Sequence, residues 1–379
     1  MHSSSHPRRI LLCAVGLSPQ IVTETVFALV KQESPAFVPT EVHIVTTREG
    51  ANRAALMLLD RGQGHFRLLR EAYDLPPIEF TEQHIHVVQD ADGKPLEDIT
   101  DDAGNTASAD EMVRLVREFT ASPDSALHVS IAGGRKTMGY LLGYALTLFG
   151  REQDRLSHVL VSSPFESHPE FFFPTPTPQV LMVGQERKPV DASQARVQLV
   201  QIPYVSLRSG LANLMVDGST ASFGDTIRKA QSVYGSSTIL ADRAKRSLIV
   251  DATEVKLPPL AFAVWLWLAR RAVEGLPAIS LHDFDRSIEI RNVFRQSTKA
   301  AFGEMDSLPD QVDALFDEIK SMLHTDGKKW LGERVNEINH RIKQAFGSVG
   351  RERLGVLTDR QHLNSTYRLA IDPSRIEIV

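Results

Sequence analysis

The amino-acid sequence predicts an α/β protein with a mostly parallel sheet, followed by a smaller α+β domain. Through the first half of the chain, short continuous apolar runs alternate with helical patterns, as in sheets whose strands are buried on both faces. From about residue 247 this alternation stops, and a long amphipathic helical pattern leads into a β-rich tail. The length of 379 residues also exceeds that of most single domains, which indicates two.

The first domain is expected over residues 1–205, with helices on both faces of the sheet. Ser108 and Glu111 have the spacing of a capping box, which predicts that a helix begins there. Residues 165–180 are rich in proline and aromatic side chains and are expected to form a packed excursion. The strands are expected within residues 9–16, 41–47, 84–90, 126–132 and 158–163, and the helices within 17–32, 51–60 and 108–120 and after Lys136.

A connecting segment is expected over residues 206–246, because the stretch 208–226 is polar and contains several glycines. The second domain, 247–379, begins with two short strand patterns within 247–256, and a helix follows the two prolines at 258 and 259. The sequence therefore predicts two domains joined by a linker.

The end of the chain alternates apolar and polar residues like a terminal hairpin. Its turn is expected at Asp372, Pro373 and Ser374. Helices that are closed by a pair of strands indicate a winged-helix-like domain, with residues 334–346 as the candidate recognition helix.

Composition restricts the possible partners. The formal net charge of −5 argues against a protein that coats nucleic acid through bulk charge, so a polyanion site has to be local. The single cysteine, Cys13, lies in an apolar strand pattern and fits a reducing cytoplasm. The longest apolar run, residues 257–269, is shorter than the roughly 20 residues that cross a bilayer. We therefore expect a cytoplasmic protein without a membrane partner.

The stretch SIAGGRKTMGYLLGYAL, residues 130–146, predicts an anion site. Gly133 and Gly134 allow a sharp turn between strand and helix, and the helix N-terminus carries partial positive charge. Arg135 and Lys136 suit phosphate, and cations are otherwise disfavoured in the first turn of a helix. The spacing is neither a Walker loop nor GxGxxG, so triphosphate hydrolysis is not expected. No metal or cofactor is expected.

Two further loops follow expected strands. In the first, Gly16 precedes Ser18 and Gln20, which are able to hydrogen-bond a ribose, a base or a phosphate. Alternatively, Ser18 caps the next helix with Pro19 at its first position. The second loop carries Thr46, Thr47 and Arg48, which either contact the ligand or cap their own helix. Because the carboxyl ends of parallel strands share one edge, these loops indicate a phosphate-bearing ligand.

Four phrases carry a family resemblance: CAVGLSPQIVTETVFAL, HIVTTREG, HVSIAGGRKTMGYLLGYALTLFGREQDRLSHVLV and PEFFFPTP. They resemble the CARF domain of a CRISPR-associated family of type III systems, over roughly the first 200 residues. The resemblance implies a Rossmann-like domain that forms a homodimer and binds cyclic oligoadenylate, with cyclic tetra-adenylate the expected ring. An isologous dimer suits a symmetric ring, because each protomer presents the same loops to equivalent halves.

Some CARF domains are ring nucleases, which cleave the ring without metal through attack by a ribose 2′-hydroxyl. By this resemblance, Lys136 and Arg135 are the candidate catalytic cations and Ser18 the candidate orienting hydroxyl. The alternative is a sensor or transcription regulator that binds the ring without cutting it. The candidate ligand-binding residues are Gly16, Leu17, Ser18, Pro19, Gln20, Thr23, Thr47, Arg48, Gly133, Gly134, Arg135, Lys136 and Thr137.

The second domain offers basic residues to a DNA or protein partner, with Arg334, Arg341 and Lys343 as the candidate contacts. Arg334 and His340 also have the spacing of a HEPN ribonuclease, but they precede a β-rich tail and lack the usual polar residue after the arginine. Residues 251–256, DATEVK, resemble the motif of a PD-(D/E)xK nuclease only loosely. The sequence therefore favours a binding role for this domain over a nuclease role.

Overall fold

The computed structural model describes residues 5–166, 168–208, 222–235, 238–251, 253–280, 309–361 and 364–379. The chain forms two compact units, residues 1–208 and 209–379. Most of the polar stretch 208–226 lies outside the described residues. The segment 206–246 contains helix α7 (Phe223–Tyr234) and strand β9 (Ile239–Asp242), and β9 pairs with a strand of the second unit.

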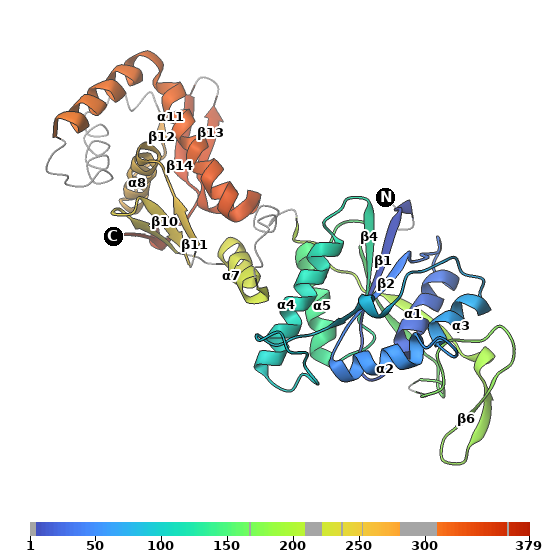
Figure 1. The fold of residues 1–379 in the computed structure, drawn as a ribbon. Helices are drawn as coiled ribbons and strands as arrows, with labels where there is room; N and C mark the ends of the chain where they lie inside the picture. The colour runs from blue at the N-terminus through green and yellow to red at the C-terminus, as the bar shows by residue number, and fades with distance from the viewer. Residues whose placement is uncertain are drawn as a thin grey trace. The chain divides into compact units, whose positions relative to one another are not determined.

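The first unit is built on a six-stranded sheet with the order β3-β2-β1-β4-β5-β8 (Figure 1). The first five strands in this order are parallel, and β8 runs antiparallel to β5. This arrangement confirms the α/β fold with a mostly parallel, Rossmann-like sheet. The strands are β1 (Arg8–Ala14), β2 (Glu41–Thr46), β3 (Ile85–Val87), β4 (Ser125–Ser130), β5 (Arg155–Val161) and β8 (Val197–Gln201).

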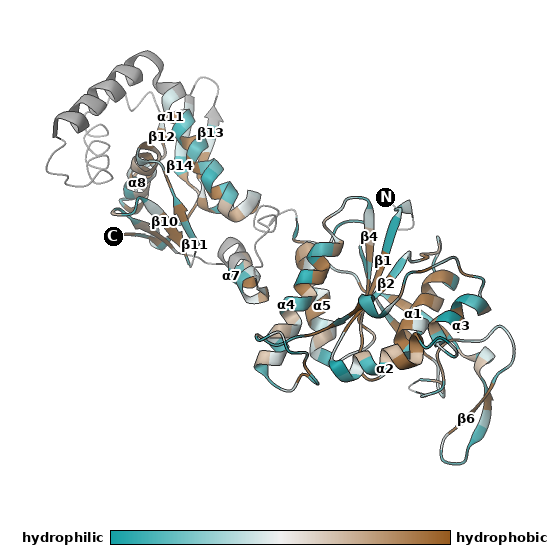
Figure 2. Cartoon of the chain, in the orientation of Figure 1, coloured by the Kyte–Doolittle hydropathy of each residue, from teal (hydrophilic) through white to brown (hydrophobic). Residues whose placement is uncertain are grey.

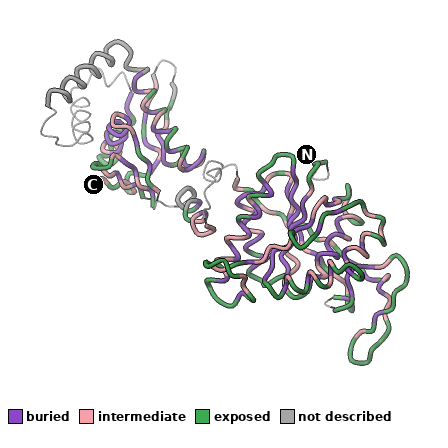
Figure 3. Tube along the Cα trace, viewed as in Figure 1, coloured by how far each residue is buried: buried purple, intermediate pink, exposed green. Residues whose placement is uncertain are grey.

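Helices cover both faces of this sheet. In Figure 1, α1, α2 and α3 lie on one side, and α4 and α5 lie together on the other. Figure 2 shows apolar residues concentrated in the strands and on the inner faces of the helices, and Figure 3 shows the same segments buried. The bounds are α1 (Gln20–Lys31), α2 (Arg48–Leu58), α3 (His65–Ala72), α4 (Asp102–Phe119) and α5 (Lys136–Phe149).

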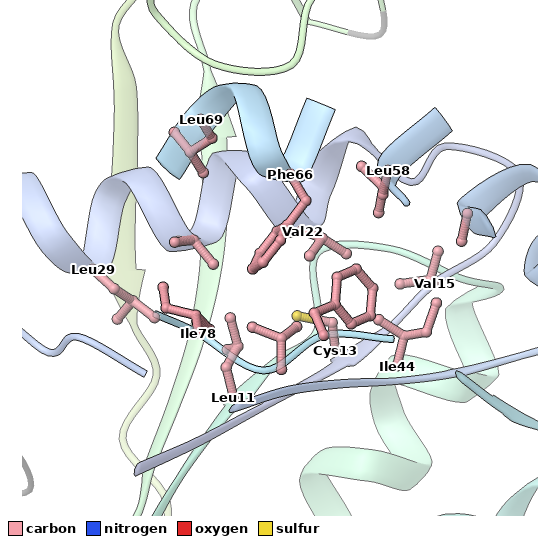
Figure 4. Packing of buried hydrophobic residues seen from close by; sticks show 14 of the residues in the cluster. Leu11, Cys13, Val15, Val22, Leu29, Ile44, Leu58, Phe66, Leu69 and Ile78 are labelled. Atoms are coloured by element: carbon pink, nitrogen blue, oxygen red, sulfur yellow. The ribbon is translucent and has the colours of Figure 1, made fainter. Parts of the chain in front are cut away.

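The core between the sheet and α1 to α3 fixes the strands that lead to the candidate loops. Leu11 and Cys13 of β1 pack with Val22 of α1 and Phe66 of α3, and all four are buried (Figure 4). Fully burying one such side chain contributes about 1.5–3 kcal/mol. The structure confirms Cys13 as a buried residue, and burial raises the pKa of its thiol.

The expected capping box at Ser108 is wrong. Helix α4 begins six residues earlier, where the Asp101 carboxylate accepts the N–H of Gly104 at 2.8 Å. Ser108 is buried inside the helix and donates to the Gly104 carbonyl, while Glu111 pairs with Arg114. An aspartate N-cap thus takes precedence over a later serine with suitable spacing, even though Gly104, Asn105 and Thr106 in the first turns are poor helix formers.

The expected excursion after β5 is packed against the unit. Phe165 and Phe171 belong to a second buried cluster, and Phe172 and Phe173 belong to the main core. The chain then forms a two-stranded hairpin, β6 (Val180–Val183) and β7 (Lys188–Asp191), and returns as β8. The sequence does not predict β6, β7 or β8.

In its described residues, the second unit forms two small sheets. Strands β9, β10 (Ser247–Val250), β11 (Thr253–Lys256) and β15 (Ile376–Ile378) form one, in the order β11-β10-β9-β15. Helix α8 (Pro259–Val273) follows β11, as expected, and most of its side chains are buried. The other sheet has the order β12-β14-β13, with β12 (Ile279–Ser280), β13 (Val356–Gln361) and β14 (Asn364–Leu369), and the 46-residue helix α11 (Pro309–Leu354) precedes β13.

The terminal hairpin with its turn at Asp372 to Ser374 is wrong. The turn itself exists, because the Asp372 carboxylate accepts the N–H of Ser374 at 2.9 Å. However, β14 pairs with β13, while β15 joins β9 in parallel, with Ile376 opposite Ile239. The alternating pattern identified the strands, but it does not specify which partners they take.

The described helices include none that is both long enough and apolar enough to cross a membrane.

Candidate functional site

The loops after β1, β2 and β4 meet at the carboxyl edge of the main sheet. A Cβ atom on Gly16 would lie 3.2 Å from the Cα of Gly134, and one on Gly50 would lie 2.9 Å from the carbonyl oxygen of Gly16. Arg53 of α2 also donates to the carbonyl of Leu17 at 3.5 Å. The strand order reverses between β1 and β4, and ligands of open α/β sheets bind at this point.

The two glycines after β4 are required by geometry. Gly134 has φ of +79°, a conformation that side chains with a Cβ rarely adopt. A Cβ on Gly133 would lie 2.8 Å from the carbonyl oxygen of Ala14, at the end of β1. The expected sharp turn is therefore confirmed, and it holds the β4 loop against the β1 loop.

Two helix N-termini at this edge lack a side-chain cap. Helix α5 has Arg135 at its N-cap and α1 has Pro19, and neither has an acidic residue in its first turn. Ser18 makes no capping hydrogen bond, so the interpretation of Ser18 as a helix cap is wrong. Backbone N–H groups in the first turn of a helix have no partner within the helix, and together with the helix dipole they favour an anion.

Helix α2 differs, because its N-terminus is capped. The Thr47 hydroxyl accepts the N–H of Gly50 at 3.5 Å, and Thr47 is buried. The capping interpretation of Thr47 is thus confirmed. Thr46 is fully buried at the end of β2. Of this loop, only Arg48 among the predicted residues is exposed at the surface.

Two arginines of the candidate site are paired with adjacent carboxylates. Arg135 donates from Nε to Oδ1 of Asp98 at 2.8 Å, and a second hydrogen bond makes the pair bidentate. These hydrogen bonds hold the pKa of Asp98 below its ordinary value. The Nε of Arg48 lies 3.3 Å from Oε1 of Glu97. Lys136 and Thr137, at the start of α5, are exposed.

The sequence reading missed Glu97 and Asp98. They lie in the segment between β3 and α4, which no motif singled out. The backbone N–H of Arg48 donates to the carbonyl of Leu96 at 2.8 Å, and this hydrogen bond holds the segment beside the loops. Glu97 and Asp98 become neighbours of Arg48 and Arg135 only in the tertiary structure.

The first turns of α1 contribute a buried polar group. Gln20 donates from Nε2 to the carbonyl of Pro169 at 3.1 Å, and the buried Thr23 donates its hydroxyl to the carbonyl of Gln20 at 2.8 Å. Thr23 therefore supports the first turn from within the fold, whereas Leu17 and Ser18 are exposed. Glu24, which the sequence reading also missed, is buried, and this burial together with Glu166 raises its pKa to about 8.

The candidate nucleic-acid contacts lie on α11 in the second unit. Arg341, Lys343 and His340 are exposed, whereas Arg334 is half-buried and lies 3.7 Å from Glu337. The opposite face of this helix is buried, and the Asn339 side chain pairs with both backbone groups of Val356 at the start of β13. The helix thus presents cations outward while it anchors the β13–β14 pair.

The fold and these loops define a mostly parallel α/β protein in which three loops meet at the switch point of the sheet. Residues 18–231 match the family model of CRISPR-associated protein NE0113, which is more than half of the chain. The chain therefore belongs to this CRISPR-associated family, and the membership supports a role in CRISPR defence. A search of curated proteins found no match.

Proposed function

We propose that this protein binds cyclic oligoadenylate at the three loops and, as a homodimer, cleaves cyclic tetra-adenylate to linear products that end the signal. The observation that carries the proposal is the contact between Gly16 and Gly134, which places the uncapped N-termini of α1 and α5 at one edge. Backbone N–H groups and adjacent cations suit the repeated phosphates of such a ring.

The cleavage step requires little covalent chemistry from the protein. The ribose 2′-hydroxyl loses its proton and attacks the adjacent phosphorus, the P–O bond to the next 5′-oxygen breaks, and that oxygen takes up a proton. The products carry a 2′,3′-cyclic phosphate and a 5′-hydroxyl. Lys136 and Arg135 would stabilise the charge on the phosphorane, and Ser18 would orient the hydroxyl. Arg135 would first exchange its carboxylate partner, Asp98, for a phosphate.

A second copy of the chain suits the exposed face of α5. Tyr140 follows Lys136 by one helical turn, is 67% exposed, and its ring centroid lies 5.9 Å from that of Tyr144. Aromatic side chains are enriched in the cores of protein interfaces. This pair beside the β4 loop supports a dimer in which both copies present that loop to one ring.

A second candidate function is a cyclic oligoadenylate-responsive regulator that binds the ring without cutting it. Among the elements that the structure describes, the order α8, β12, α11, β13, β14, with β14 central in its sheet, favours a winged-helix-like domain. In this reading, Arg341 and Lys343 contact DNA or a protein partner, with Arg334 beside them.

One experiment separates these functions. The full chain is incubated with cyclic tri-, tetra- and hexa-adenylate in EDTA, and the products are followed by chromatography. Loss of linear product in Lys136→Ala, with unchanged cleavage in the control Lys188→Ala on the β7 hairpin, supports the ring nuclease. Tight binding of an intact ring supports the regulator. A protein that neither binds nor cuts any of the three rings contradicts both.

A further inference from the structure

Three side chains suited to metal coordination lie together at the amino end of β2 and β3, opposite the loops described above. Glu41 and His43 share one face of β2, because residues two apart in a strand do so. His84 ends the 3-10 helix η2 (Glu82–His84), which leads directly into β3. One potential ligand atom from each residue lies within 4.8 Å of the other two.

The distances are close to those of a coordination sphere. Nε2 of His43 lies 3.1 Å from Oε2 of Glu41. Two ligands bound at about 2.0–2.1 Å to a tetrahedral zinc ion lie roughly 3.3 Å apart. An ion would thus replace the proton between these two atoms with little movement. The widest pair has to close by at most roughly 1.5 Å on the same geometry, which requires the half-buried His84 side chain to shift against Thr81.

Neighbouring groups orient each of these side chains. Nδ1 of His43 lies 3.0 Å from Nε2 of His86, so a His43 bound through Nε2 can donate its other ring proton to His86. Nδ1 of His84 accepts the backbone N–H of Thr81 at 3.2 Å and lies 2.9 Å from the Thr81 hydroxyl, so binding of a metal through Nε2 requires the proton to move to Nδ1, which then donates to that hydroxyl. Arg8 holds the carboxylate of Glu41. Its positive charge fixes the carboxylate but also weakens the affinity for a cation.

We propose that Glu41, His43 and His84 bind a divalent ion of the zinc class, with water completing the coordination. Two imidazoles and a carboxylate suit Zn²⁺, whereas Mg²⁺ and Ca²⁺ prefer oxygen ligands. The ion would fasten η2 and the three-residue edge strand β3 to β2. The sequence indicated no metal site, because His84 follows His43 by 41 positions and only the β2–β3 pairing unites them.

The test uses the full chain, stripped of metal with a chelator and titrated with Co²⁺, whose visible absorption reports its coordination. Zn²⁺ is expected to displace Co²⁺ from this site. His43→Gln and His84→Gln should each weaken Co²⁺ binding by about tenfold or more. The control His158→Gln, on β5, should leave it unchanged. Zn²⁺ should also raise the melting temperature of the wild type but not that of His84→Gln.

Two results would overturn the proposal. Unchanged Co²⁺ affinity in both cluster variants, with folding verified by circular dichroism, would place the ion elsewhere in the chain. A wild-type protein that binds neither Co²⁺ nor Zn²⁺ at submillimolar concentration would show that the cluster is a hydrogen-bonded network only. Because His84 is half-buried, His84→Gln keeps the test valid if His43→Gln fails to fold. No nucleotide is needed, so the outcome is independent of ring binding.

Discussion

The two edges of the main sheet place a glutamate in opposite electrostatic situations. Near the carboxyl edge, burial of Glu24 and the nearby Glu166 raise the pKa of Glu24 to about 8. At the amino edge, burial alone would raise the pKa of Glu41, but hydrogen bonds from His43 and Arg8 lower it to about 2. Burial favours the neutral form of both carboxyl groups, and only Glu41 has hydrogen-bonding partners that reverse this effect. One edge favours a neutral buried carboxyl group beside the candidate ligand loops, and the other favours an ionised one among potential cation ligands.

The largest expected effect comes from Glu24→Gln. The pKa of Glu24 is raised in the folded chain, so its contribution to stability is fully present below the ordinary value of 4.5 and is lost as pH rises through about 8. The variant stays neutral, and it should exceed the wild type by about 2–4 kcal/mol at pH 8 while the two converge near pH 4.5.

Urea unfolding at pH 5 and pH 8, followed by circular dichroism, measures this difference. All three tryptophans, Trp265, Trp267 and Trp330, lie in the second unit. Their fluorescence transition therefore reports the second unit, which does not contain Glu24. An equal stability difference at both pH values would show that Glu24 is ionised in the folded chain, and the comparison of the two edges would fail.

The second-largest effect is expected from an alanine substitution of Gly134 in the loop after β4. Gly134 and Gly184 have similar φ values, +79° and +71°, but a Cβ on Gly134 would lie 3.0 Å from the Met138 sulfur, whereas one on Gly184 meets nothing within 4 Å. Each alanine variant should lose about 1–3 kcal/mol of stability through backbone strain. Only Gly134→Ala should also weaken cyclic tetra-adenylate binding, by about tenfold, which is about 1.4 kcal/mol.

Fluorescence anisotropy with a labelled ring and thermal melting measure the two quantities separately. Gly184→Ala is the matched control for strain, because it lies in the turn of the β6–β7 hairpin. If Gly184→Ala lost as much affinity for cyclic tetra-adenylate as Gly134→Ala, backbone strain would weaken binding through the fold as a whole. The loop after β4 would then have no specific role in binding.

The smallest effect concerns the pairing of Arg135 with Asp98. Asp98→Asn removes a competitor for the guanidinium, so the affinity for cyclic tetra-adenylate should rise about two- to fivefold, in keeping with the modest energy of exposed ion pairs. The gain should shrink as salt is added. Asp92→Asn, at an exposed position of the same segment, is the control. A loss of affinity in Asp98→Asn would instead assign Asp98 to positioning Arg135 for the ligand.

Much of the first unit could be predicted because β1, β2, β4 and β5 are continuous apolar runs that end in glycine or polar loops. The β8 strand escaped prediction, because its five residues form a short edge strand that follows a proline- and aromatic-rich segment and pairs antiparallel. The terminal strands were recognised, but their partners were wrong, since Ile376 pairs with Ile239, more than 130 positions earlier.

The residues of the candidate site also fall into those that the sequence predicts and those that it does not. The loops with Gly16 and Gly133–Gly134 were predicted, because a glycine turn between a strand and a helix is a local signal. Glu24, Asp98 and the histidine cluster were missed, because their significance depends on neighbours that only the tertiary structure supplies. Of the two interpretations of Ser18, the helix cap is wrong, since the spacing alone does not show where the hydroxyl lies.

The contacts among Gly16, Gly50 and Gly134 have a consequence for protein engineering. A side chain added at any of these positions meets the backbone or side chains of a neighbouring segment, so the framework of the loops tolerates little variation. Leu17, Ser18 and Thr137 are exposed beside that framework and do not form it. Libraries that aim to change the ligand preference of the proposed site should therefore vary these three positions and leave the glycines intact.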